Sequence, residues 1–185
     1  MERGRSRCYK DVIHVALQKV IQRKCRGIPP RAMAIIENGF FAYLSTAEPE
    51  CSPHITTMFY LWDVETCRTY LITSEDTKKL RNIKRNPNVA LTIDERDPES
   101  PKGNRGVLIR GKARILSVRE MGDVLMNRYL QKYLDFLGRG FPMGSRVVIE
   151  VIPRVLHFWR GVNFYKWINP NYKKTLRSLT RLVDL

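Results

Sequence analysis

The sequence predicts one mainly β domain with flanking helices, an α+β fold in which about six antiparallel strands form a closed or half-closed barrel. Six segments after residue 39 are rich in β-branched and aromatic residues and are bounded by turn-forming residues, which is typical of short strands. Helical periodicity interrupts this pattern at only two places. Few helices among many short strands favour a barrel over a doubly wound parallel sheet.

Length and composition indicate a globular protein with its own core. A chain of 185 residues buries roughly 70% of the surface that its unfolded form exposes. Hydrophobic residues make up 43% of the chain and charged residues 28%, and no apolar run approaches the roughly 20 residues of a membrane-spanning helix. The basic N-terminus is not followed by a signal-type apolar stretch, so we expect a cytoplasmic protein that does not bind membranes.

The first 38 residues are predicted to form an N-terminal helical segment. Residues 9–25 place apolar side chains on one face at helical spacing. A second, short helix is expected over residues 31–37, because proline precedes it and Asn-Gly follows it. The barrel then takes up residues 39–160, and residues 161–185 form a basic C-terminal extension packed on the same domain.

The strands and the helices between them follow in a definite order. The six strands are predicted at residues 40–46, 54–62, 69–73, 88–94, 107–117 and 147–152. Helices are expected at residues 77–85, which Asn86 and Pro87 stop, and at residues 118–136, before a glycine. Leucines at spacing three predict a last short helix over residues 172–182.

The four cysteines, Cys8, Cys25, Cys51 and Cys67, lack the spacing of a metal site. None forms a C-x-x-C pair or lies near a histidine at metal-ligand spacing. We therefore expect no metal ion, and we expect the cysteines to be apolar fillers or free thiols in a reducing compartment.

The net charge of +15 is distributed unevenly along the chain. Residues 1–31 carry +7, residues 32–67 carry −5 and residues 68–100 carry +1. Residues 101–153 and residues 154–185 carry +6 each. This excess could serve nucleic acid, phosphorylated ligands or solubility, and composition does not choose among them.

The segment from Tyr70 to Leu91 reads as strand, turn, basic helix and strand. Thr73 ends the strand, and Thr77, Lys78 and Lys79 follow in the first helical turn. Hydroxyls, backbone amides and ammonium groups at the positive end of a helix form a phosphate cradle. The alternative interpretation is a solvated basic helix.

Several motifs follow one another from about Phe40 to Trp159, over roughly two-thirds of the chain. They are Phe40–Thr46 with Ser52–Met58, Ile72-Thr73 with Thr77–Lys79, Asn86–Leu91, Val107–Ile115 and Phe158–Gly161. In their order and spacing, with a G-x-A strand and a closing F-W-x-G among them, they resemble the pyridoxamine 5′-phosphate oxidase family of FMN-binding split β-barrels.

The resemblance implies a homodimer with FMN at the interface of its two barrels. The flavin phosphate would be bound by one set of residues, the isoalloxazine would be lined by a second set, and a tryptophan would pack near it from the second subunit. These roles fall on Ile72, Thr73, Thr77, Lys78 and Lys79, then on Thr56, Thr57 and Met58, and finally on Trp159. A flavin needs a charged phosphate anchor, flat apolar surfaces and polar groups at its ring edge.

The chain departs from the family's oxidase pattern beyond F-W-x-G. Where the oxidase has R-x-H-D-R, this sequence reads Tyr165-Lys-Trp-Ile-Asn169. We therefore expect a flavin-dependent oxidoreductase of undefined substrate, acting on a small molecule other than pyridoxamine phosphate. F420 on the same barrel is an alternative cofactor, and basic nucleic-acid binding is an alternative of a different class.

No catalytic residue is assigned from the sequence. His54, at a strand start close to the expected flavin edge, is the best candidate for proton transfer. The alternative is a structural histidine bonded to the backbone.

Overall fold

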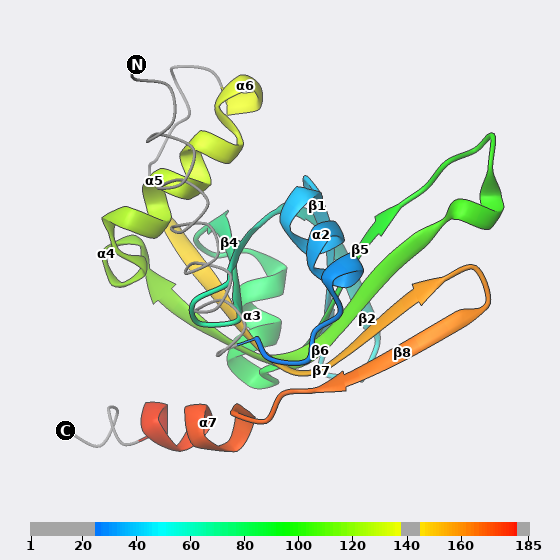
Figure 1. The fold of residues 1–185 in the computed structure, drawn as a ribbon. Coiled ribbons are helices and arrows are strands. Elements are labelled where there is room, and N and C mark those ends of the chain that lie inside the picture. The colour runs from blue at the N-terminus through cyan, green and yellow to red at the C-terminus, as the bar shows by residue number, and fades with distance from the viewer. Residues whose placement is uncertain (1–24, 138–144, 181–185) are drawn as a thin grey trace, which may run out of the picture.

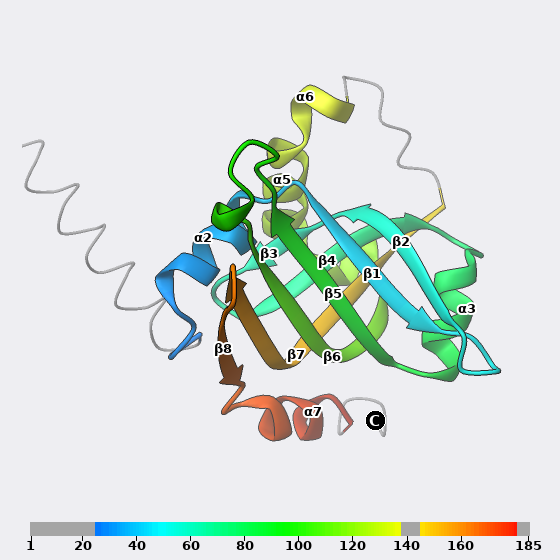
Figure 2. The ribbon, with the colours of Figure 1, turned by 90° about the vertical axis from the view of Figure 1, so that its right-hand side faces the viewer.

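The computed structural model describes residues 25–137 and 145–180, which form one curled antiparallel sheet with helices along its edges (Figures 1 and 2). All but the last residue of the helix predicted over residues 9–25 lie outside the described residues, as do residues 181 and 182 of the helix predicted at the C-terminus.

Eight strands make up the sheet, in the order β2-β1-β5-β6-β7-β4-β3, with β8 paired to β7. Every pairing is antiparallel. The strands are β1 (Phe41–Ala47), β2 (Pro53–Phe59), β3 (Leu61–Asp63), β4 (Arg68–Ser74), β5 (Asn88–Glu95), β6 (Arg105–Ser117), β7 (Arg146–Arg160) and β8 (Asn163–Ile168). The sheet curls until β2 approaches β4 without pairing to it, so the predicted half-closed barrel is confirmed.

The strand predicted over residues 54–62 is two strands, which is one reason why the structure has eight strands instead of six. The strand is interrupted at Tyr60, whose side chain is fully buried. Its hydroxyl donates to the Ile36 carbonyl at 2.6 Å, and its backbone amide donates to the Tyr133 hydroxyl at 2.9 Å. These long-range hydrogen bonds take the place of strand pairing at residue 60, and no local sequence pattern indicates them.

Strand β7 continues well beyond the predicted end at Ile152. Pro153 indicates a strand end in the sequence because proline cannot donate to a ladder. In the structure the register between β6 and β7 shifts at Arg110 and Gly111, so this irregularity accommodates the proline and the strand runs on to Arg160. β8 then pairs with this added length and is the second strand that the sequence prediction missed.

The helices lie at the ends and along one side of the sheet (Figure 1). They are α2 (Pro30–Asn38), α3 (Lys78–Arg85), α4 (Val118–Met121), α5 (Asp123–Lys132), α6 (Leu134–Leu137) and α7 (Tyr172–Thr180), with a 3-10 turn at Pro101–Gly103. The single helix predicted over residues 118–136 is interrupted by Gly122 at φ 81°, a conformation that glycine adopts without strain. None of the described helices combines the length and the apolar character that crossing a membrane requires.

The sheet buries two apolar clusters, one on each face. The barrel interior holds Leu44, Leu71 and Ile109, and the opposite face of β4 and β7 packs Ile72 and Val148 under α4 and α5. Strand alternation explains the division, because Leu71 and Ile72 are neighbours that point to opposite faces. Burying each such side chain stabilises the fold by about 1.5–3 kcal/mol.

The expectation that all four cysteines are unpaired is wrong for two of them. Cys25 and Cys67 form a disulfide with their Cα atoms 5.6 Å apart, and both are buried. The two cysteines are 42 residues apart in the sequence, so no local pattern indicated this pairing. The turn between β3 and β4 brings Cys67 to the segment before α2. Cys51 is free and exposed.

Candidate functional site

A short turn joins β4 to α3 and fixes where that helix begins. Asp76 adopts φ 56°, and Arg81 of α3 donates from Nη1 to its carbonyl at 3.0 Å and its carboxylate at 2.8 Å. The Glu75 amide donates to the Ser145 carbonyl at 3.0 Å. The turn that leads into α3 is therefore held by Arg81 of that helix and by the residue before β7.

Thr77 precedes the first residue of α3 but does not cap the helix with its side chain. Its hydroxyl is buried and has no hydrogen-bond partner among the described residues. The first amides of a helix also lack acceptors within the helix, and their dipoles attract an anion. An unpaired buried hydroxyl is costly, so an anion bound here would satisfy it.

The two lysines that follow Thr77 differ in their surroundings. The Lys78 amine forms an ion pair with Glu48 at 2.7 Å. Among the described residues, no carboxylate lies within ion-pair distance of the Lys79 amine. Partial burial lowers the pKa of Lys79, because desolvation disfavours its charged form. Lys79 is therefore the cation at this site that an anionic ligand would stabilise most.

Strand alternation separates the two predicted residues of β4. Thr73 is buried and shares the barrel side with Leu71. Ile72 points the other way and packs in the cluster under α4 and α5. The Thr73 side chain therefore points towards the barrel interior. Of Ile72, only the backbone is accessible to a ligand on that side.

The three predicted residues of β2 are likewise divided between two faces. Thr56 pairs with Leu44 and Met58 pairs with Ala42, and both partners are buried in the barrel interior. Thr57 pairs with Tyr43, which is exposed on the outer face. A flat ligand on one face of β2 would therefore meet either Thr57 or the other two side chains, but not all three.

Helix α3 is fastened to the turn between β1 and β2. Asn82 donates from Nδ2 to the Thr46 hydroxyl at 3.0 Å, and that hydroxyl donates to the His54 carbonyl at 3.4 Å. Thr56 and Met58 lie two and four residues beyond His54, roughly 7 and 13 Å along an extended strand. A ligand with an anionic end at α3 and an apolar body along β2 fits this order.

Trp159 lies far from the start of α3 within one protomer. Val147 of β7 pairs with Thr73, and Trp159 is twelve residues further on, roughly 40 Å along the strand. Its ring covers Gly106, where a Cβ atom would lie 2.6 Å from the ring. Only the Trp159 of a second protomer could approach a ligand at this site.

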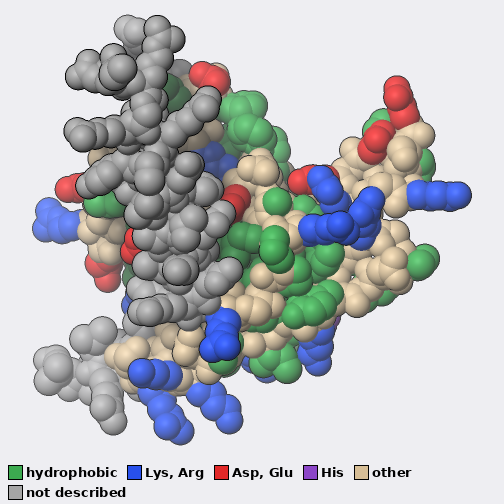
Figure 3. Space-filling model, viewed as in Figure 1, with side chains coloured by type: hydrophobic (Ala, Val, Ile, Leu, Met, Phe, Trp, Pro, Cys, Tyr) green, Lys and Arg blue, Asp and Glu red, His purple; other side chains and the backbone are tan. Residues whose placement is uncertain are grey.

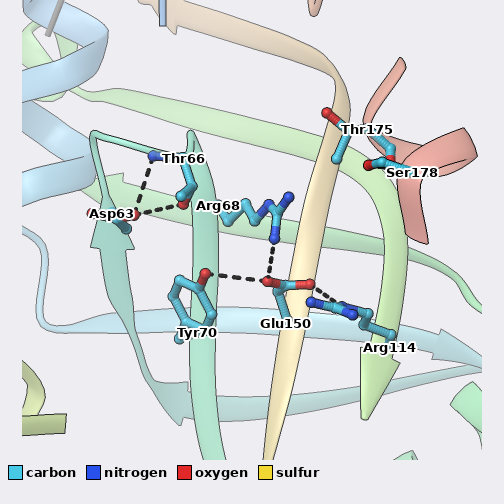
Figure 4. A network of polar contacts seen from close by, with 8 residues as sticks. All are labelled: Asp63, Thr66, Arg68, Tyr70, Arg114, Glu150, Thr175 and Ser178. Atoms are coloured by element: carbon cyan, nitrogen blue, oxygen red, sulfur yellow. Dashed lines mark hydrogen bonds and ion pairs between the residues drawn. The ribbon is translucent and has the colours of Figure 1, made fainter. Parts of the chain in front are cut away.

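A second polar cluster, which the sequence analysis missed, surrounds Glu150 of β7 (Figure 4). Its carboxylate is 1% exposed and accepts hydrogen bonds from Arg68 Nη1 at 2.8 Å, from the Tyr70 hydroxyl at 3.1 Å and from Arg114 Nε. Burial alone would raise the pKa of Glu150, but the two guanidinium groups outweigh it and lower that pKa. The only sequence signal was one carboxylate within an apolar strand, V-V-I-E-V-I.

The histidines and acidic residues offer little further chemistry. No group of three or more His, Cys, Asp or Glu side chains in the described part of the chain could hold a metal ion. The His54 Nδ1 atom lies 3.5 Å from the Thr46 hydroxyl, so this histidine belongs to the contacts that hold β2 and α3 together.

Comparison with known proteins adds to this geometry. The sequence profile of pyridoxamine 5′-phosphate oxidase matches residues 28–160. No curated protein sequence matches the chain at a significant level.

Among solved structures, an F420 reductase shares 26% sequence identity at a TM-score of 0.56, with 70% of this chain and 98% of that chain covered. Protein Rv2991 from Mycobacterium tuberculosis shares 21% at a TM-score of 0.61, with coverage of 73% and 86%. A heme binding protein from Mycobacterium smegmatis shares 16% at 0.61, with coverage of 80% and 61%. The last two show a common fold alone, and together these likenesses confirm the predicted split barrel.

Proposed function

This chain belongs to the pyridoxamine 5′-phosphate oxidase family, and from that premise we propose that it binds FMN and acts as a flavin-dependent oxidoreductase. The flavin phosphate lies at the start of α3, and the ring system lies along β2. The observation that carries the proposal is that, among the described residues, the buried Thr77 hydroxyl has no hydrogen-bond partner and the Lys79 amine has no counter-ion.

The residues at the start of α3 fit a phosphate in chemistry as well as position. Lys79 supplies a charge, Thr77 a hydroxyl donor and the first turn of α3 its free amides. Hydrogen bonds to a charged group contribute about 1.5–3 kcal/mol each, so these donors together would hold the cofactor tightly. Lys78 contributes less, since it is shared with Glu48.

The ring system would lie between two protomers. Thr57, on the outer face of β2, offers one surface, and Trp159 of the second protomer offers another. Exposed apolar side chains on the outer face of β1 and β2, Phe41, Tyr43 and Ile55, support a homodimer because surfaces of this kind mark protein interfaces. When bound, FMN supplies the electron and hydride chemistry, while these residues position it and exclude water.

The substrate differs from pyridoxamine phosphate in this proposal. Residues 165–169, which stand where the oxidase has R-x-H-D-R, contact other parts of the same chain. The Tyr165 hydroxyl donates to the Gly27 carbonyl at 3.1 Å, and Trp167 Nε1 donates to the Arg26 carbonyl at 2.9 Å. These side chains hold the segment before α2 against β8. Lys166 is the only cationic residue among residues 165–169.

F420 is the second candidate cofactor. The likeness to an F420 reductase covers 98% of that chain at 26% identity, and its cofactor also carries a phosphate that Lys79 and Thr77 could bind. Which of the two cofactors binds decides between the two activities.

The test is a titration of purified protein with FMN and with F420, followed by absorption and fluorescence. We expect tight binding of one cofactor, at least tenfold weaker in Lys79→Ala. Lys84→Ala is the matched control, because Lys84 is an exposed lysine in the last turn of the same helix. A wild-type protein that binds neither cofactor would overturn the proposal, and equal losses in the two variants would overturn the site.

A further inference from the structure

A hollow lies beside α7, where β1 ends and β5 begins. It has a volume of about 510 Å³, and its lining comes from the ends of β1 and β5, from β6 and β7, and from the first residue of α7. Arg110, Arg154 and Tyr172 line it, together with Ser45 and Asn88. None of the residues assigned to the flavin phosphate lines this hollow. Thr46, which does line it, accepts a hydrogen bond from Asn82 of α3, so the two sites are neighbours with different lining residues.

A β-bulge in β7 directs Arg154 to this hollow. Arg110 pairs with Val155 and Gly111 pairs with Pro153, which leaves Arg154 as the extra residue. Pro153 and Val155 on either side of it are buried, whereas Arg154 is exposed. Bulges re-aim side chains and are common beside functional sites.

Glycine at position 111 makes this bulge possible. A Cβ atom on Gly111 would lie 2.1 Å from the Ile152 carbonyl oxygen, which is far inside contact distance. The sequence therefore specifies the close approach of β6 and β7 at the point where Arg154 leaves the ladder.

The segment after β8 holds the bulge in place. Asn169, which is buried, donates from its backbone amide to the Arg154 carbonyl at 3.0 Å and from Nδ2 to the Pro153 carbonyl at 2.8 Å. The Tyr172 amide in turn donates to the Asn169 carbonyl at 3.3 Å. These residues lie beyond the 28–160 match, so this chain's own extension orders Arg154 and brings Tyr172 to the rim.

The charge of this region is uncompensated. No carboxylate lines the hollow, and within the described ranges Arg110 and Arg154 form no ion pair. Helix α7 contains no acidic residue and exposes Lys173, Lys174 and Arg177. Figure 3 shows basic side chains gathered along α7 at the lower edge of the molecule. This potential would attract an anion towards the hollow.

We propose that the hollow binds a small phosphorylated metabolite, whose phosphate is held by Arg110 and Arg154 and whose remaining part lies against Tyr172. A guanidinium group presents paired donors that match phosphate oxygens. The volume lies within the range of roughly 300–1,000 Å³ that is usual for small-molecule sites. Ser45 and Asn88 supply further polar groups for the same ligand.

Calorimetry with AMP and with pyrophosphate tests the site. Arg154→Ala and Arg110→Ala should each raise the dissociation constant at least tenfold. Arg177→Ala is the matched control, because it removes an equal charge from exposed α7 outside the hollow, and it should change the constant less than twofold. Arg154→Lys should restore only part of the affinity, because lysine lacks the paired donors.

Thiol labelling gives an independent measure. Cys51 is free and lines the hollow, so in a Cys8→Ser background bound AMP should slow its reaction with a thiol reagent. Failure of both probes to bind, or equal weakening in Arg177→Ala, would overturn the proposal. Tighter binding of a single-stranded oligonucleotide, in competition with AMP, would show a nucleic-acid surface instead. Weakened FMN binding in Arg154→Ala would assign the hollow to the flavin site, whereas loss of FMN in Lys79→Ala alone concerns only the proposed function.

Discussion

The cluster around Glu150 and the start of α3 both gather charged and hydroxyl groups on one curled sheet, but they differ in what is left unpaired. The buried Glu150 carboxylate is fully occupied by Arg68, Arg114 and Tyr70. At α3, Thr77 has a buried hydroxyl without a partner and Lys79 has no counter-ion in the described part of the chain. The closed cluster has its hydrogen-bonding groups satisfied within the fold, whereas the open one leaves donors available to a ligand.

The largest expected effect is on the closed cluster. Glu150→Ala removes the acceptor shared by two guanidinium groups, and breaking a buried pair in this way costs about 3–5 kcal/mol. We expect urea denaturation to show a loss of that size in the free energy of unfolding. Glu65→Ala, at an exposed position near Arg68, is the control. A loss below about 1 kcal/mol, the size typical of surface pairs, would contradict a structural role for Glu150.

The disulfide should reinforce the same closed region. Cys67 directly precedes Arg68, so its bond to Cys25 fixes the turn from which Arg68 reaches Glu150. Closing a 42-residue loop stabilises a fold by about 4 kcal/mol in the chain-entropy account. Cys67→Ser should lower the unfolding free energy by up to that amount under oxidising conditions. Under reducing conditions the variant and the wild type should unfold alike, and a persisting difference would count against the disulfide.

Acid should open the closed cluster. The pKa of Glu150 lies below its ordinary value of 4.5 in the folded protein, so its contribution to stability is complete above that value. That contribution is lost as the pH falls through the folded pKa. Denaturation series between pH 7 and pH 3 should show the difference between the wild type and Glu150→Gln shrinking as the pH falls below 4.5. A constant difference between the two proteins at all pH values would exclude this titration.

At the start of α3, Thr77→Val should lower FMN affinity without lowering the stability of the fold. The substitution removes a buried hydroxyl that has no partner and keeps the side-chain shape, so the unfolding free energy should not fall. FMN affinity should drop roughly ten- to a hundredfold, equivalent to the ~1.5–3 kcal/mol of a hydrogen bond to a charged group. Thr77→Ser is the control that retains the donor. Unchanged affinity in Thr77→Val would remove this hydroxyl from the site.

The smallest effect is expected for Lys78→Ala. Its ion pair with Glu48 is half exposed on the lysine side, and such pairs contribute about 0–1 kcal/mol. Both the unfolding free energy and the FMN affinity should change little compared with Lys79→Ala. A loss of affinity as large as that of Lys79→Ala would show that the ligand draws Lys78 away from Glu48.

Local patterns predicted much of the fold. Alternation, β-branched residues and turn residues located the strands around Phe41, Thr69, Asn88 and Val107, because these signals lie within each strand and the turns that bound it. The basic helix after Thr73 was found for the same reason, since its start and stop residues lie within ten positions. The phosphate-site hypothesis came with it, because Thr77 and Lys79 are close in sequence.

Long-range contacts could not be predicted in this way. The break at Tyr60 depends on Ile36 and Tyr133, and the extension of β7 past Pro153 depends on Gly111 and Asn169. Each of these features joins residues that are far apart in the chain. No local propensity encodes such a partner.

The sequence by itself determined which residues carry charge, hydroxyls and glycines, and hence a mainly β barrel with a basic helix start. Only the tertiary structure decided which of these groups meet partners. It paired Lys78 with Glu48, and it left Lys79 without a counter-ion in the described part of the chain. It also closed Glu150 between two arginines, joined Cys25 to Cys67 and turned Arg154 out of the sheet. The physical reason is that hydrogen bonding and ion pairing depend on distances of a few ångströms, which the folding of the whole chain sets.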